Sequence, residues 1–467
     1  MQAPIGRAQR AEGERSSENR DPRDRLRPAL GLQDAVFLVV ASVVGSGIFL
    51  TPGPIAERLP HPGLIFAAWI AGGLLSLAGA LANAELGTMY PRAGGDYVYL
   101  REAFHPVAGF LVGWLTFFAI YAGTVATLAV GFGAGVAALL GLEGSAVLAI
   151  AVATIAATSA LNYVSVRWGA RANNATGWLK VLALLAFGLL APLTGEGSLA
   201  NLSPLLEGVA AAAPASAFAL ALSPVLFSYL GWNASIYVAS EIHDPARNLP
   251  RSLFLGLGIC TGIYLVMNAA YLYALPVAEL RHADNAGEAA ARALFGGFGG
   301  RLVAGFVLAS ILGTLNATVL VGPRIAYAMA LDGLFFRGVD RVHATYRTPT
   351  GAILVQALTA IGILALLRTF PSALDFTTFA ILLATIADVA ALYALRRRQP
   401  DRPRPYRAWG YPWIPAFYVV ATAYVAVVLF QERTLEATTG VLVLLAALPV
   451  YVLFARSRSA YRSSSPR

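Results

Sequence analysis

Val44-Gly45-Ser46-Gly47-Ile48-Phe49 interrupts the first apolar stretch of the chain with two glycines. The sixth apolar stretch contains a similar glycine break, Phe227-Ser228-Tyr229-Leu230-Gly231-Trp232-Asn233. Inside a bilayer every backbone N–H and C=O needs a partner, so a helix is nearly compulsory. Glycine relaxes that constraint because it reaches backbone angles closed to other residues. Interrupted helices at corresponding places in two halves of a membrane protein are typical of a transporter's substrate site.

The composition indicates that most of this chain lies in lipid. Of its 467 residues, 57% are hydrophobic and only 13% are charged. A membrane-spanning helix needs roughly 20 apolar residues, and the apolar stretches are long enough for about twelve such helices. We therefore predict an all-α membrane protein.

The two breaks suggest how the helices are organised. Helices one to five and six to ten form two sets that each begin with a broken helix. Because five is an odd number, the sets enter the membrane in opposite directions, so we expect a 5+5 inverted repeat with discontinuous helices 1 and 6. The predicted parts are a disordered cytoplasmic tail (1–30), a transporter domain (31–455) made of repeat one (31–195), repeat two (214–396) and two appended helices (411–455), and a second cytoplasmic tail (456–467).

The net charge of +9 reflects orientation in the membrane and not a nucleic-acid partner. If the loops alternate with the amino terminus inside, few basic residues remain outside: Arg58, Arg281, Arg292, Arg301, Arg368 and Arg433. The positive-inside rule then places both termini in the cytoplasm. We expect a multi-pass protein of the cell (inner) membrane, with lipid and no nucleic acid among its partners.

No enzymatic chemistry is indicated. None of the five histidines has a metal-ligand spacing with another histidine, a cysteine or a carboxylate. No Ser-His-Asp arrangement and no phosphate-binding loop is suggested. The single cysteine, Cys260, lies in an apolar stretch, where it is expected to be a small buried residue. We predict no metal, no cofactor and no catalytic residue.

The breaks are expected to bind a molecule that carries both signs of charge. Unwinding leaves the amides of Ser46, Gly47 and Ile48 at the amino end of a half-helix, where a carboxylate is favoured. Freed carbonyls would accept from an ammonium group; they are those of Val43 and Val44, beside Gly45, and of Phe227, Ser228 and Leu230. A zwitterionic α-amino acid matches this arrangement. The competing interpretation is that the glycines serve only packing or hinge motion.

Longer motifs then resemble those of the amino acid–polyamine–organocation superfamily, and most closely the bacterial relatives of L-type amino acid transporters. They cover residues from about 30 to 410 and include the first break through Gly53, the segment from Ala84 to Phe104, the second break, Glu241 with Pro245 to Pro250, and Gly313 to Gly333. The resemblance implies substrate carboxylate binding at Ser46 and Gly47 and ammonium binding at the carbonyls of both breaks. It also implies that Phe227 is an aromatic gate.

Lys180 is the only lysine in the chain and lies within the fifth span. An ammonium at such depth normally faces a cavity or a partner, although a long side chain can also reach back to the interface. The surrounding sequence resembles the fifth helix of sodium-independent relatives. We therefore expect Lys180 to take the place of a sodium ion, bonded to carbonyls from Ala41 to Val44 and to Ser310 or Thr314. Proton release by this lysine is a further option.

Other polar residues receive structural or gating roles. Glu85, Glu241 and Arg324 are expected to form ion pairs or latches at the inner gate. Trp232 and Asn233 either brace the second break or touch the substrate, and Asp388 faces polar neighbours such as Thr385 or the inner vestibule. The third span offers Thr116, Tyr121, Thr124 and Thr127 but no carboxylate, which favours neutral substrates.

The sequence thus predicts a permease that moves neutral amino acids by alternating access. Sodium independence is expected, and exchange and proton symport both remain open. Two alternatives stay in view. One is an amino acid sensor with a transporter fold, and the other is a transporter of cationic amino acids or polyamines. The oligomeric state is not predicted.

Overall fold

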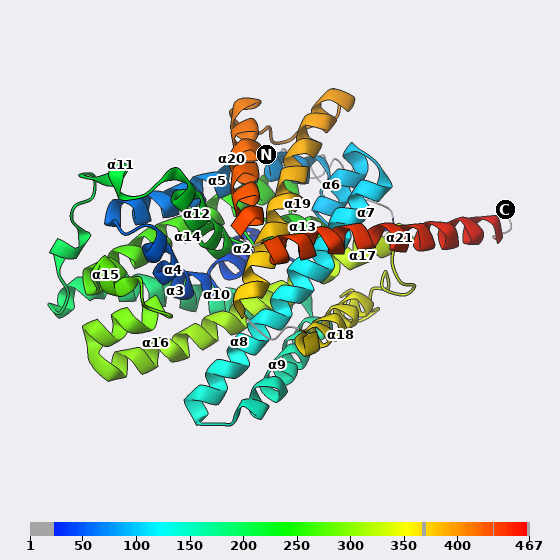
Figure 1. The fold of residues 1–467 in the computed structure, drawn as a ribbon. Coiled ribbons are helices and arrows are strands. Elements are labelled where there is room, and N and C mark those ends of the chain that lie inside the picture. The colour runs from blue at the N-terminus through cyan, green and yellow to red at the C-terminus, as the bar shows by residue number, and fades with distance from the viewer. Residues whose placement is uncertain (1–22, 367–369, 433, 465–467) are drawn as a thin grey trace, which may run out of the picture.

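The computed structural model describes residues 23–366, 370–432 and 434–464, and these residues fold into a bundle of helices (Figure 1). Ten helical segments are long and apolar enough to cross a membrane. Two shorter apolar helices, Ala215–Ser228 and Thr350–Leu364, complete the number of spans that the sequence predicts. The only β-pairings in the described residues are isolated bridges between Leu30 and Ile242 and between Ala93 and Val238. The predicted all-α membrane fold is confirmed.

The first half of the chain contains the first break between α2 and α3. Its helices are α2 (Leu32–Val43), α3 (Gly47–Leu50), α4 (Pro52–Arg58), α5 (Pro62–Met89), α6 (Asp96–Ala103), α7 (Pro106–Leu115), the π-helix η1 (Thr116–Ala122), α8 (Gly123–Leu140), α9 (Gly144–Val164), α10 (Val166–Leu190) and the short turns η2 (Ala191–Thr194) and η3 (Leu199–Leu202).

The second half contains the second break between α12 and α13. Its helices are α11 (Val209–Ala212), α12 (Ala215–Ser228), α13 (Ala234–Tyr237), η4 (Ala239–Glu241), α14 (Pro245–Ala274), α15 (Val277–Leu280), α16 (Ala286–Val321), α17 (Pro323–Leu331), α18 (Thr350–Leu366), α19 (Phe370–Arg398), α20 (Trp413–Glu432) and α21 (Thr434–Ser464).

Local sequence explains where many helices begin and end. Proline occupies the first position of α5, α7, α14 and α17, where its missing N–H has no intrahelical partner to lose. The imidazoles of His61 and His105 accept hydrogen bonds from the first turns of α5 and α7. Gly141 ends α8 in the left-handed conformation that glycine favours.

Burial separates central from peripheral helices. In the most apolar part of Leu32–Leu50, 78% of the residues are buried. In the corresponding part of Val166–Thr194, 22% of the residues are buried. Large apolar side chains such as Leu182 and Leu189 are exposed on α10, as expected for a surface that faces lipid. The broken helix therefore lies inside the bundle, where its unpaired backbone is shielded from lipid.

The two ends of the bundle are distinct. One end, here called the tail side, carries Arg23, Arg101 and Asp332, which are joined by ion pairs. The other, here called the far side, carries Leu139, Asn285 and Glu288, which line one cavity. In Figure 1, α11 and α15 lie at the far side, and α6 lies with the carboxyl end of α21 at the tail side.

Two expectations for the ends of the molecule are corrected. The tail does not extend to residue 30, because Leu26 and Leu30 are buried and Leu30 pairs with Ile242; residues 1–22 lie outside the described part. The last helix continues to Ser464 and so passes the boundary expected at residue 455. The short helix α6 lies inside the bundle, because Tyr97, Tyr99 and Leu100 are buried.

Candidate functional site

The first break opens the backbone of α2 and α3 as predicted. Val44 leaves the helical conformation (φ −77°, ψ 87°), and helix resumes at Gly47 after Ser46. In the described part of the chain, the amides of Ser46, Gly47 and Ile48 have no backbone acceptor. These three donors point from the start of a half-helix, which is the arrangement that favours an anion.

The second break is a turn that Gly231 makes possible. Gly231 has φ +90°, a conformation that side-chain-bearing residues rarely adopt. The Leu230 amide donates to the Phe227 carbonyl (3.0 Å), and the Ala234 amide donates to the Gly231 carbonyl (2.9 Å). The Leu230 carbonyl has no backbone partner within the described residues.

The two breaks contact each other. A Cβ atom added to Gly231 would lie 2.6 Å from the Ser42 Cβ, and one added to Gly47 would lie 2.6 Å from the Ser228 Oγ. The hydroxyls of Thr51 and Ser228 are 3.0 Å apart. Glycine at these positions therefore allows the close approach of two segments that lie about 180 to 190 residues apart in the sequence.

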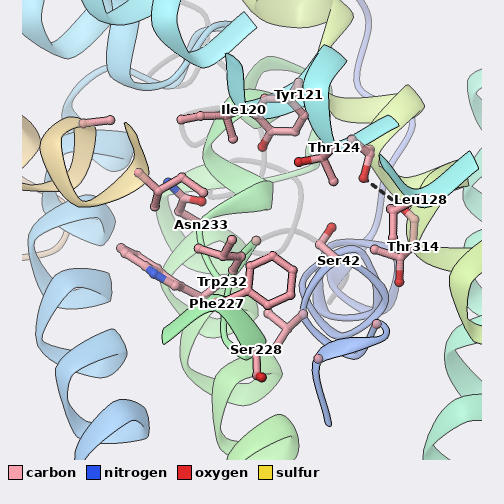
Figure 2. A pocket seen from close by; sticks show the side chains of 18 of the residues that line it. Ser42, Ile120, Tyr121, Thr124, Leu128, Phe227, Ser228, Trp232, Asn233 and Thr314 are labelled. Atoms are coloured by element: carbon pink, nitrogen blue, oxygen red, sulfur yellow. Dashed lines mark hydrogen bonds between the residues drawn. The ribbon is translucent and has the colours of Figure 1, made fainter. Parts of the chain in front are cut away.

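A small pocket of about 90 Å³ lies between the breaks. Figure 2 shows side chains of Phe227 and Trp232 on one side and Ile120, Tyr121 and Thr124 on the other. The predicted residues that line it are Val43, Gly45, Ser46, Gly47, Phe227, Ser228, Leu230, Trp232, Asn233 and Thr314. Val44 and Ile48 are fully buried and do not line it.

Sequence reasoning missed several lining residues. Ser42 precedes the break, and Thr318 and Thr385 come from α16 and α19. Asp96 also lines the pocket, from the first residue of α6. The third span indeed carries no carboxylate, but the pocket does. Asp96 follows Gly94-Gly95, whose positive φ angles (107° and 48°) turn the chain into the bundle, and that glycine pair is the only local signal.

Tyr264 of α14 was also missed, and its hydroxyl lies between the breaks. It is within 2.8 Å of the Val43 carbonyl and 2.6 Å of the Ser228 carbonyl. One hydroxyl proton can serve only one of them at a time. Both carbonyls belong to the predicted ammonium site, and each keeps a lone pair for a further donor.

Lys180 is buried on α10 and points at the first break. Its Nζ donates to the Val44 carbonyl (2.6 Å), the Ala41 carbonyl (3.1 Å) and the Thr314 Oγ1 (2.8 Å). The Ser310 Oγ also donates to the Val44 carbonyl (3.3 Å). The side chain does not reach back to the interface. Instead, it supplies a positive charge to carbonyls that the break has released.

The predicted gate residues form buried ion pairs. Arg324 makes two hydrogen bonds to the Glu241 carboxylate (2.7 and 3.0 Å), and both side chains are 1% exposed. Glu85 accepts from Arg396 (2.5 Å) and from the Ala408 amide (2.6 Å). Removing one partner of such a pair leaves an uncompensated buried charge.

Asp332 joins three segments on the tail side. It accepts from Tyr97 (2.6 Å), from Arg23 (2.9 Å) and from Arg101. Burial raises the pKa of the Asp332 carboxyl, but the Arg101 charge and these hydrogen bonds outweigh it and hold the pKa below its ordinary value. The carboxylate therefore stays charged at neutral pH.

The far side is more open than the tail side. A cavity of about 530 Å³ lies between α8 and α16, and Ser46 and Leu128 line both this cavity and the pocket. Asn285 and Glu288 lie in its wall near the far side. On the tail side, the cavity beside Arg101 and Asp332 measures only about 20 Å³.

Comparisons with known proteins show what this chain is similar to. The family described as amino acid permease matches residues 30–454. The serine/threonine exchanger SteT of Bacillus subtilis (strain 168) is 30% identical over 433 residues, which cover 91% of this chain and 96% of that protein. The human b(0,+)-type amino acid transporter 1 is 28% identical and covers 96% of this chain and 93% of its own length. The human Asc-type amino acid transporter 1 is 28% identical over an alignment that covers 92% of this chain and 82% of that protein.

Proposed function

This chain belongs to the amino acid permease family, and from that membership and its site we propose that it exchanges or symports neutral amino acids without sodium. It is an amino acid transporter of the membrane and not an enzyme. The observation that carries the finer proposal is the contact between the two breaks, where Gly231 packs on Ser42 and Gly47 on Ser228.

In this proposal the substrate spans the two breaks. Its carboxylate accepts from the amides of Ser46, Gly47 and Ile48, which have no backbone acceptor in the described residues. Its ammonium group donates to carbonyls of Val43, Phe227, Ser228 and Leu230. Phe227 closes over the side chain, and Trp232 and Asn233 complete the wall.

Lys180 supports sodium independence. A sodium ion at this position would need oxygen ligands, and the ammonium group already occupies the oxygens of Ala41, Val44 and Thr314. The fixed charge would hold the first break in shape during every cycle.

The difference between the two sides of the bundle supports alternating access. The far-side cavity would admit substrate to the pocket, while Glu241–Arg324, Glu85–Arg396 and the Asp332 contacts would hold the tail side shut. Opening of these latches would release the substrate there. We place the tail side and both termini in the cytoplasm because most arginines lie on that side.

A second candidate is transport of cationic amino acids. Asp96 in the pocket wall favours it, because a carboxylate could pair with a basic side chain. Purified protein in liposomes loaded with an unlabelled amino acid separates the candidates, with labelled serine, threonine, leucine and arginine outside.

We expect saturable uptake of neutral amino acids that is unchanged when choline replaces sodium. Loss of uptake in choline would refute sodium independence, and a preference for arginine would favour the second candidate. Tight binding without uptake would indicate a sensor. Protein-free liposomes serve as the control.

A further inference from the structure

Two carboxyl groups, those of Asp96 and Asp388, meet inside the bundle beside the pocket. Asp96 is the first residue of α6, and Asp388 lies in α19. They are 1% and 0% exposed, and their side chains face each other. The pair is therefore shielded from bulk water except where Asp96 borders the pocket.

These two carboxyl groups lack the partners that the other buried acids have. Glu85, Glu241 and Asp332 each pair with arginine. By contrast, neither Asp96 nor Asp388 forms an ion pair with any residue of the described segments. The Tyr237 hydroxyl donates to Asp96 Oδ2 (2.6 Å), but Asp96 Oδ1 and both Asp388 oxygens have no hydrogen-bond partner of normal geometry there.

The groups around the pair are neutral. They come from five elements and are Asn83 of α5, Tyr99 of α6, Thr116 and Tyr121 of η1, Tyr237 of α13 and Tyr418 of α20. Tyrosine hydroxyls are uncharged at neutral pH. Two carboxylates that share a buried site repel each other, so the pair favours binding of a proton. That proton would also supply a donor between the two carboxyl groups.

The pair is connected to the pocket by contacts. Asp96 lines the pocket. The Tyr237 hydroxyl that donates to Asp96 accepts from Asn233 Nδ2 (3.3 Å), and Asn233 belongs to the second break. A substrate that fills the pocket displaces water from Asp96, and a desolvated carboxyl group favours its protonated form.

We propose that Asp96 and Asp388 form a proton-binding site that fills together with the neighbouring substrate pocket. This inference rests on the proposed function and chooses proton symport from its two modes. A proton enters from solution as substrate binds and leaves with it. By reciprocity, acid solution strengthens substrate binding.

Calorimetry tests the linkage on the purified protein. Serine, or the best substrate of the panel above, is titrated at one pH in two buffers of different ionisation enthalpy. The wild-type protein should take up protons on binding. Asp388→Asn should still bind substrate, since Asp388 does not line the pocket, but should take up almost none. Asp284→Asn, at an exposed position on the far side, is the matched control and should behave as wild type.

Liposomes test the coupling. With the membrane potential clamped, an inward proton gradient of one pH unit should drive accumulation of up to about tenfold for one proton per substrate. Asp388→Asn should lose this accumulation and continue to exchange labelled for unlabelled substrate. If that variant does not fold, Asp388→Ser gives the same test, because it also removes one carboxyl group of the pair and leaves the residues that line the pocket unchanged.

Several results would overturn the inference. The first is that the wild type binds substrate without proton uptake anywhere between about pH 5 and 8. The second is that proton uptake persists in both variants. The third is that a sodium gradient drives accumulation of substrate. Tighter arginine binding as the pH rises would show that the pair stays charged and contacts basic side chains. Failure of the wild type to bind any amino acid would instead refute the proposed function.

Discussion

In the first break, the Val44 carbonyl accepts hydrogen bonds from side chains of two other helices. The donors are Lys180 of α10 and Ser310 and Thr314 of α16. In the second break, the backbone bonds mostly within its own turn, at Phe227 and Gly231. The first break is thus anchored to α10 and α16, whereas the second is held by its own turn and by contacts with α5 and α14, through the Tyr229 hydroxyl and the Ser228 carbonyl.

The contact between the breaks should be the most sensitive point. Gly231→Ala places a Cβ 2.6 Å from Ser42 Cβ and 3.0 Å from the Ser42 carbonyl carbon, at a φ of +90°. Overpacking and the strained backbone together should destabilise the site by about 2–5 kcal/mol. Substrate affinity measured by calorimetry should fall by more than about tenfold.

Gly258→Ala on α14 is the matched control, because nothing lies within 4 Å of its added Cβ. Its affinity should equal that of the wild type. Equal binding by Gly231→Ala would contradict the close contact.

Lys180 should have the next largest effect, because it defines the difference between the breaks. Lys180→Ala removes a charged donor from Ala41, Val44 and Thr314. The first break should lose about 1.5–3 kcal/mol of stabilisation, and this loss should appear as slower exchange of labelled substrate in liposomes. Leu182→Ala, on the exposed face of the same helix, is the control. Wild-type exchange by Lys180→Ala would exclude the anchoring role.

Tyr264 touches both breaks and should have a smaller effect. Tyr264→Phe removes the hydroxyl near the Val43 and Ser228 carbonyls, which should weaken substrate binding by about 1 kcal/mol. Tyr271→Phe, on the same helix, removes a buried hydroxyl without a hydrogen-bond partner in the described chain and is the control. If both variants bind equally well, Tyr264 does not join the breaks.

Ser310 should contribute least. Its hydrogen bond to the Val44 carbonyl is long, at 3.3 Å, and the same oxygen accepts from Lys180 at 2.6 Å. Ser310→Ala should therefore cost the first break about 0.5 kcal/mol of stabilisation, and the exchange rate in liposomes should fall only slightly. A loss as large as that of Lys180→Ala would show that the hydroxyl, and not the ammonium group, anchors the first break.

The sequence predicts best those features that a nearby glycine or an isolated charged residue indicates, such as the two breaks and the role of Lys180. Gly45, Gly47 and Gly231 mark both breaks because helix interruption within an apolar stretch needs them. The all-helical membrane fold follows from apolar stretches of spanning length, and Lys180 is noticeable because the chain has no other lysine.

What depends on packing between distant helices could not be predicted. No local signal in the sequence shows that Asp96 is buried against Asp388 or that Arg101 pairs with Asp332. These partners are more than 200 residues apart in sequence. Tyr264 is one of many aromatic residues in apolar stretches, and nothing local marks its hydroxyl.

Competition between substrate analogues tests most directly whether the breaks recognise an amine and an acid together. The analogues are the best substrate, its carboxamide and its deaminated form, each titrated against labelled substrate bound to the purified protein. Because each change removes a charged hydrogen-bonding group, each should weaken binding by about 1.5–3 kcal/mol. Binding as tight as that of the intact amino acid by either analogue would contradict the account.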